Sequence, residues 1–239
     1  MSPTAAVGLA VQTAQDIVGY SDRSLNRLQL VFDSVHLNSK SASISSTEPN
    51  YRPAWSLKLE GETYPRIPYA QKGVPNDEEL TLLHSEIQAA IATLDWQNLA
   101  QLTLFVEKFG SHLSFGDPDI ALIDVARSTA AIAAALAQEP PDNKLALVGG
   151  DLMGVQKFIY TISSEGALKS LRARSFYLEL ATEEVVQQIL TELSLPRINV
   201  IYAGASKFYL LVAAMQELDE ILDRIQNQFN QWLNNAFQC

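Results

Sequence analysis

The sequence predicts an α+β fold, and three observations in residues 142–239 support this prediction. A short apolar run, residues 145–148, is followed by two stretches whose apolar residues recur at helical spacing. Two more apolar runs, residues 198–202 and 208–212, are separated by a short turn over residues 204–206, which is typical of a tight hairpin. A long helical stretch follows. The order strand, helix, helix, strand, hairpin, strand, helix is that of a ferredoxin-like palm, the unit of polymerases and nucleotide cyclases. Such a palm usually has one more strand, which we expect to be missing.

The chain divides into four regions by the spacing of apolar residues and by loop-forming residues. We predict a helical lead-in over residues 1–37, a linker with short strands over 38–76, a mainly helical region over 77–141 and an incomplete palm over 142–239. Apolar residues from Leu25 to Val35 have helical spacing. Serine and proline punctuate the linker, and alternation over residues 55–59 predicts one short strand inside it.

The mainly helical region is predicted to hold three helices. Two follow the apolar residues from Leu80 to Leu94 and from Leu99 to Val106. Asp117-Pro118 is a good N-cap and first-turn pair, so we expect a third helix to begin there. Pro140-Pro141 ends it, because proline lacks an amide donor and blocks the preceding turn.

The first predicted palm strand, residues 145–148, is wholly apolar, which is typical of a strand buried on both faces. It is expected to stop at Gly149-Gly150-Asp151. A helix then presents apolar residues from Val155 to Ile162 on one face. A basic segment, residues 169–174, leads into the next helix.

Composition narrows the class of function. The share of hydrophobic residues, 47%, is ordinary for a globular protein. A formal net charge of -10 means that the surface as a whole repels phosphate, so any nucleotide contact must be local. Cys239 is the single cysteine, which argues against a disulfide framework and fits a reducing cytoplasm. No apolar run approaches the ~20 residues that span a bilayer, so we expect a soluble protein without a membrane partner.

Asp151 stands where a palm places one of its metal-binding carboxylates, at the end of the first strand. A catalytic palm needs at least two carboxylates, because it holds two metal ions, and the others normally lie in the hairpin turn. That turn reads Gly204-Ala205-Ser206-Lys207 and has none. We therefore predict no catalytic residue. The alternative role of Asp151 is an N-cap for the helix that follows.

Three cations, Lys169, Arg172 and Arg174, lie within six positions and beside several serines. Cations, hydroxyls and free amides near a helix start form phosphate cradles. The alternative is a solvated loop whose cations pair with glutamates such as Glu165 and Glu179.

Histidines and aromatic residues carry weaker signals. The three histidines are far apart and outside any metal-binding spacing, so each is expected at the surface or in packing; they are His36, His84 and His112. Four aromatic residues at helix or strand spacing are expected mostly in the core, with some of them able to stack on a base; they are Tyr160, Phe176, Tyr202 and Tyr209.

Two segments, Gly150–Tyr160 and Gly166–Leu178, closely resemble the first palm of the large subunit of type III CRISPR effector complexes. Ile201–Leu211 is similar to the hairpin of that palm, and Asp119–Leu136 is similar to the helix that precedes it. Weaker similarity reaches back to Arg27–Phe32, so the resemblance runs from the end of the nuclease domain through the first palm.

The resemblance implies an ATP-contacting, non-catalytic palm. The family has a His-Asp nuclease domain and two palms, binds ATP between the palms, and makes cyclic oligoadenylates when the complex meets target RNA. This chain has no adjacent His-Asp pair and no second palm, and Ala205-Ser206 replaces hairpin glycines. ATP and Mg²⁺ are implied only in a composite site. The implied nucleotide contacts are Asp151, which is also the metal ligand, and Lys169, Arg172, Arg174, Ser206 and Lys207.

Two hypotheses follow. In the first, the chain is a partial large subunit that contributes this palm to cyclic oligoadenylate synthesis in CRISPR antiviral defence. Its partners are other effector subunits, through them guide RNA and target RNA, and a separate polypeptide with the second palm. In the second, it is an inert structural remnant that docks on effector subunits, because an unfinished sheet invites a partner.

Overall fold

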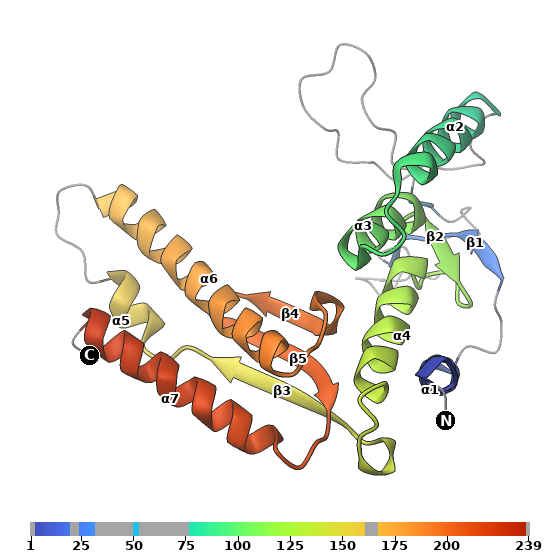
Figure 1. Cartoon of the computed structure of the whole chain (residues 1–239). Helices are drawn as coiled ribbons and strands as arrows, with labels where there is room; N and C mark the ends of the chain where they lie inside the picture. Colours follow the sequence, from blue (N-terminus) through green and yellow to red (C-terminus); the bar gives the residue numbers. More distant parts are fainter. Residues whose placement is uncertain (1–2, 20–23, 32–49, 53–76, 161–166, 238–239) are drawn as a thin grey trace, which may run out of the picture. The chain divides into compact units, whose positions relative to one another are not determined.

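The fold mixes helices with two small antiparallel sheets (Figure 1). The computed structural model describes residues 3–19, 24–31, 50–52, 77–160 and 167–237. Its α-helices are α1 (Pro3–Val18), α2 (Asp77–Thr93), α3 (Leu99–Gly110), α4 (Leu122–Leu136), α5 (Val155–Tyr160), α6 (Ala167–Glu192) and α7 (Leu218–Phe237). Its strands are β1 (Leu25–Arg27), β2 (Leu113–Phe115), β3 (Leu145–Asp151), β4 (Val200–Gly204) and β5 (Lys207–Ala213), and two short 3-10 helices are η2 (Pro141–Asn143) and η3 (Arg197–Asn199).

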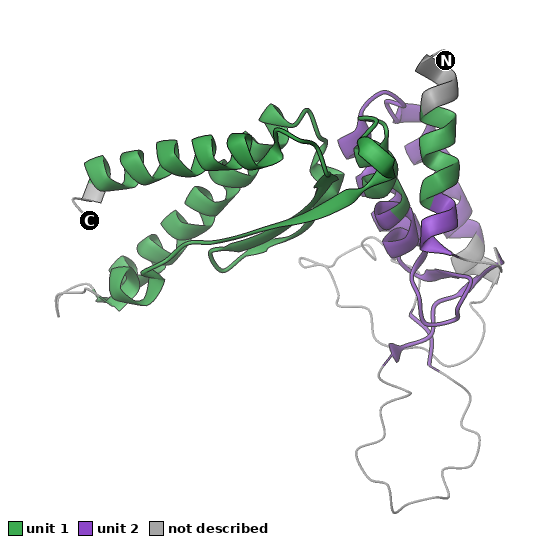
Figure 2. Ribbon diagram, turned by 90° about the horizontal axis from the view of Figure 1, so that it is seen from below, with its two compact units in different colours: residues 1–14, 129–239 green, residues 15–128 purple. Residues whose placement is uncertain are grey.

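The chain forms two compact units (Figure 2). One unit joins residues 1–14 to residues 129–239, and the other contains residues 15–128. Among the helices of the described ranges, none is both long and apolar enough to cross a membrane.

The unit of residues 15–128 contains the sheet of β1 and β2. Leu25 lies opposite Phe115, and the backbone N–H of Leu28 donates to the carbonyl of His112 at 2.9 Å. The predicted helix over Leu25 to Val35 is therefore wrong at its start, because backbone pairing with a segment far along the chain overrides local spacing. Its end, most of the predicted linker and the predicted strand over 55–59 lie outside the described residues.

The helices between residues 77 and 136 agree largely with the sequence prediction, and the last of them crosses from this unit into the other. Residues 77–93 and 99–110 are helical, as predicted. The third helix begins at Leu122 and not at Asp117, because residues 117–120 form a turn in which Ile120 N–H donates to the Asp117 carbonyl. It ends at Leu136, before the two prolines.

The other unit is built on a three-stranded sheet in the order β3-β5-β4. In β3 and β5, Leu145 lies opposite Ala213 and Asp151 lies opposite Lys207. The helices α6 and α7 cover one face of this sheet (Figure 1). The core between them includes Val148, Val186, Leu190, Phe208, Leu210, Val212, Ile225 and Phe229.

The opposite face of the sheet is open. Leu147 is 64% exposed, although the apolar run of residues 145–148 predicted a strand buried on both faces. The prediction is wrong because both covering helices pack on the side of Val148, and the described residues place no layer over the other side. The strand also continues through both glycines to Asp151.

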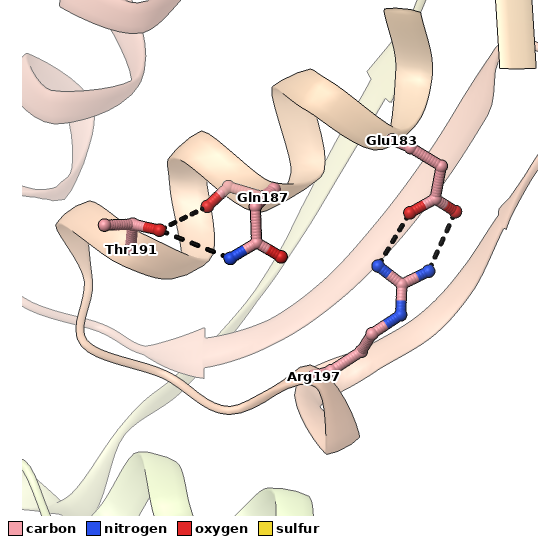
Figure 3. A network of polar contacts seen from close by, with 4 residues as sticks. All are labelled: Glu183, Gln187, Thr191 and Arg197. Carbon is pink, nitrogen blue, oxygen red and sulfur yellow. Dashed lines mark hydrogen bonds and ion pairs between the residues drawn. The ribbon is translucent and has the colours of Figure 1, made fainter. Parts of the chain in front are cut away.

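Polar contacts fix the entry to β4. The buried Asn199 amide donates to the carbonyls of Ala131 at 2.9 Å and Leu211 at 2.8 Å, so it joins the C-terminal half of α4 to β5. Two residues earlier, Arg197 forms a two-pronged ion pair with Glu183 of α6 (Figure 3), and the hydrogen bond to Glu183 raises the pKa of the guanidinium. Together these contacts fix the position of η3, from which β4 begins.

Candidate functional site

The end of β3 and the hairpin turn bring Asp151 and Lys207 together next to Ser206, whose side chain is buried. Asp151 Oδ2 lies 3.5 Å from Lys207 Nζ, and both side chains are more than half exposed. The turn residues Ala205 and Ser206 have positive φ values of 50° and 71°, as a two-residue type I′ hairpin requires. The backbone N–H of Leu152 donates to the Ser206 carbonyl at 2.9 Å, which closes this end of the sheet.

Asp151 is not the N-cap of the following helix. It is the last residue of β3, whereas α5 begins only at Val155. The N-cap interpretation is wrong because the strand pairing with Lys207 extends through this position. The carboxylate therefore faces the hairpin and its ammonium partner.

The turn is also held by α6. The backbone N–H of Ala205 donates to Glu179 Oε1 at 2.9 Å. The sequence allows Glu179 as an ion-pair partner for the basic segment, but in the structure its carboxylate accepts from the hairpin. Glu165, the other candidate, lies outside the described residues.

The basic segment lies within α6 and not in a loop before it. Lys169 and Arg172 are exposed and three residues apart, so they share one side of the helix. Arg174 takes another direction. Its guanidinium donates to the Phe158 carbonyl and lies 5.2 Å from the centroid of the Phe158 ring. The three cations therefore do not converge on one point.

Arg174 also lines a cavity of about 790 Å³ between α5, α6 and α7. The lining is mostly apolar, with Ser170 and Lys157 as further polar residues. Neither the Asp151 carboxylate nor the hairpin turn takes part in this cavity. The predicted nucleotide contacts thus divide between the hairpin end, the exposed side of α6 and this cavity.

A magnesium centre does not fit the described residues alone. No group of three or more His, Cys, Asp or Glu side chains within the described ranges is placed to hold a metal ion. Magnesium is usually held by carboxylates together with substrate phosphates. Here Asp151 stands beside the ammonium of Lys207, which competes with a cation for the same oxygens.

The open face of the sheet was missed as a candidate site. Tyr202 and Tyr209 are 48% and 44% exposed, and Tyr160 and Phe176 are more exposed still, so the prediction that these residues lie mostly in the core is wrong. For Tyr209 the sequence held a signal. The strand alternates between outward residues such as Tyr209 and buried residues such as Leu210, which assigns a face to each position.

The two glycines of β3 make room for aromatic rings on opposite faces. A Cβ atom at Gly150 would lie 2.2 Å from Cζ of Phe208, on the helix-covered side. A Cβ atom at Gly149 would lie 3.1 Å from Cε1 of Tyr209, on the open side. The nearest neighbours of the two missing side chains are therefore aromatic rings.

Comparisons with known proteins agree on one family for the C-terminal part. Residues 144–239 match the family model described as Csm1 subunit domain B. The Cas10/Csm1 single-strand-specific deoxyribonuclease (subtype III-A) of Thermococcus onnurineus is 28% identical over 237 residues, covering 90% of this chain and 30% of the relative. The corresponding protein of Mycobacterium tuberculosis is 41% identical over 87 residues, covering 36% of this chain and 11% of the relative.

Solved structures give the same result over nearly the whole chain. Csm1 of T. onnurineus superposes with a TM-score of 0.73 at 25% identity, covering 96% of this chain and 32% of that chain. A Csm1-Csm4 cassette in complex with pppApApA gives a TM-score of 0.71 at 25% identity, covering 96% and 31%. This chain therefore spans about a third of the length of the proteins that it resembles.

Proposed function

We propose that this chain, which resembles the large subunit of type III CRISPR effector complexes from the end of the nuclease domain through the first palm, contributes an ATP-contacting, non-catalytic palm to cyclic oligoadenylate synthesis. The proposal rests on the hairpin end of the sheet, where the exposed side chains of Asp151 and Lys207 come together beside a turn that contains no carboxylate of its own. The Ser206 side chain is buried, so only its backbone lies at this end of the sheet. The similar Csm1-Csm4 cassette that holds pppApApA supports an adenine nucleotide as the ligand.

The strand order supports the palm assignment. In a ferredoxin-like sheet the first strand pairs with the third and the third with the second, which is the order β3-β5-β4. A fourth strand would pair with the free edge of β3, beside Leu145–Asp151. Covering helices on one face and an open face on the other also fit this architecture.

The same residues argue that this palm does not catalyse by itself. Two-metal chemistry needs at least two carboxylates to hold the metal ions, and the turn here offers Ala205 and Ser206. The described carboxylates near the hairpin end are Asp151, which stands beside Lys207, and Glu179, which accepts from the Ala205 backbone N–H. We propose that a second palm supplies the remaining carboxylates, so that Mg²⁺ and ATP are held only in the composite site.

Lys207 is the best-placed cation for a phosphate. Its ammonium has three N–H donors, and the contact with Asp151 leaves donors for a ligand. Lys169 and Arg172 extend exposed cations from α6, whereas Arg174 is already engaged with Phe158. Two or three charge-assisted hydrogen bonds of about 1.5–3 kcal/mol each correspond to roughly millimolar affinity for the half-site.

The test is a titration of the folded chain with ATP and magnesium by calorimetry. We expect Asp151→Ala, Lys207→Ala and Arg172→Ala each to weaken binding several-fold. Lys144→Ala is the matched control, because Lys144 is also exposed and ion-paired, with Asp142 at 2.9 Å, but lies before the other end of β3. Absence of ATP binding by a folded wild-type chain would refute the proposal.

Docking on effector subunits is the second candidate, and the open sheet face favours it. Leu147 and Ile201 expose 64% and 54% of their surface there. The subunit to test first is Csm4, because similar chains were solved as Csm1-Csm4 assemblies. A chain that co-purifies with Csm4 in the cytoplasm, and through it with guide and target RNA, but ignores ATP would be a structural subunit only.

A further inference from the structure

The open face of the β3-β5-β4 sheet, defined here as the outward residues of its three strands, is organised in three rows across the strands. The row nearest the hairpin turn contains Asp151, Lys207 and Gly204. The second row contains Gly149, Tyr209 and Tyr202, and the third contains Leu147 and Leu211. A charged row, an aromatic row and an aliphatic row thus follow one another along the strands.

The second row forms an aromatic platform. Gly149 has no side chain, so the edge of the Tyr209 ring extends across β3, with Cε1 3.1 Å from where a Cβ atom would be. Tyr209 belongs to the central strand and is still 44% exposed. One side of its ring is therefore supported by backbone and the rest is accessible to a ligand.

Tyr202 widens this platform toward the hairpin. Its ring centroid lies 6.5 Å from that of Tyr209, with the planes tilted by 43°. Its hydroxyl lies 3.3 Å from where a Cβ atom of Gly204 would be, next to the first row. A β-bulge between Val200 and Tyr202 turns both Ile201 and Tyr202 outward, so the exposed ring is a consequence of the strand geometry.

The positive charge of Lys207 and its distance from the aromatic row favour a nucleotide as the ligand of this face. Neighbouring rows are two residues apart, which is about 6.5–7 Å along a strand. That spacing separates the cation Lys207 from the Tyr209 ring by about the width of the sugar that joins the base to the phosphates of a nucleotide. Bases stack on exposed aromatic side chains of open sheets in several nucleic-acid-binding folds, because every base has a π face.

We propose that the open face binds the purine base of the nucleotide, stacked on Tyr209 with Tyr202 beside it, while the phosphates extend toward Lys207. This inference rests on the proposed function, because the ligand is the same ATP. The inference adds Tyr209 and Tyr202 as contacts for the base, whereas the proposed function involves only contacts for the phosphates and Mg²⁺. The ion pair with Asp151 holds the ammonium of Lys207 at this end of the sheet.

The experiment compares ATP with inorganic tripolyphosphate on the whole chain by calorimetry, with saturation-transfer NMR on the adenine H2 and H8 protons. Stacking of one base changes affinity by roughly 5- to 100-fold. We expect wild type to prefer ATP over tripolyphosphate by a factor in that range. Tyr209→Ala should bring the ratio close to one, whereas Lys207→Ala should weaken both ligands and preserve the ratio.

Three further variants make the result specific. Tyr209→Phe retains the ring and should retain the ratio. Tyr209→Leu fills the position without a ring, so it should lose the ratio even if Tyr209→Ala disturbs the strand. Tyr160→Ala is the control, because Tyr160 is 72% exposed on α5 and away from the sheet.

The outcomes separate this inference from the proposed function. If ATP binds and Tyr209→Ala leaves its preference over tripolyphosphate unchanged, the base is elsewhere and the inference is wrong. Equal affinity of the wild type for both ligands would also overturn it, and would leave the open face for a protein partner. If neither ligand binds, the proposed function itself fails.

Discussion

Replacing Gly150 with alanine tests why β3 contains a pair of glycines. The new methyl group would start 2.2 Å from Cζ and 2.3 Å from Cε1 of Phe208, whereas ordinary contacts begin at 3.4 Å. Phe208 is only 6% exposed and is packed within the core of α6, α7 and the sheet, so its ring has little room to retreat. The substitution therefore strains the centre of the unit.

The expected loss of stability follows from two opposing terms. Overpacking a core costs about 1–3 kcal/mol, while alanine returns roughly 0.5–1 kcal/mol of the conformational cost of a glycine in a strand. The net loss of unfolding free energy is about 1–2 kcal/mol. For a chain of this size this lowers Tm by roughly 2–8 °C.

The assay is urea and thermal unfolding followed by circular dichroism. Gly149→Ala is the matched control, because its methyl group would meet the half-exposed ring of Tyr209, at 3.1 Å, on the open face. We expect a smaller loss there. In the Phe208→Leu background, Gly150→Ala should cost less than in wild type. If Gly150→Ala is as stable as wild type but binds ATP less well, the glycine serves phosphate approach and the packing argument is refuted.

Two more predictions concern buried polar groups. Asn199→Ala should lower the unfolding free energy by about 2–4 kcal/mol, because the buried carbonyl of Ala131 and the partly buried carbonyl of Leu211 lose their donor; urea unfolding measures this, with the exposed Asn230→Ala as control. The pKa of His112 is lowered, first by burial and then by Arg27 and Arg52. Below the unfolded value of about 6.5 the unfolded chain binds the extra proton, so stability should decrease as pH falls through that value. His112→Phe should remove this pH dependence, and an unchanged profile would contradict the assignment.

Most helices and strands of the C-terminal part can be predicted from the sequence. The order of strands and helices after residue 144 is as predicted, and so are the tight hairpin and the final helix. These elements depend on local signals, such as helical spacing over α7 and two residues with positive φ at the turn. The lack of a carboxylate in that turn is also a property of the sequence alone.

The candidate site is less predictable, because it depends on which surfaces meet. Sequence reasoning assigned the three cations of residues 169–174 to one cradle, but the helix directs Arg174 toward Phe158 and leaves Lys169 exposed. It gave Asp151 two alternative roles, a metal-binding carboxylate and a helix cap, and strand pairing rules out the cap by placing it beside Lys207. It expected exposed tyrosines in the core, since an apolar strand does not reveal whether one or both faces are covered.

The sequence by itself determined which residues form the hairpin turn, where the helices of the C-terminal part lie, and the resemblance to a type III large subunit. Each of these depends on residues that are close together in the chain. Only the tertiary structure decided that Leu25–Arg27 is a strand, that β3 is covered on one face, and that two glycines accommodate two rings. Each of these depends on contacts between residues far apart in the chain, and the free energy of those contacts exceeds the weak local preferences that a sequence displays.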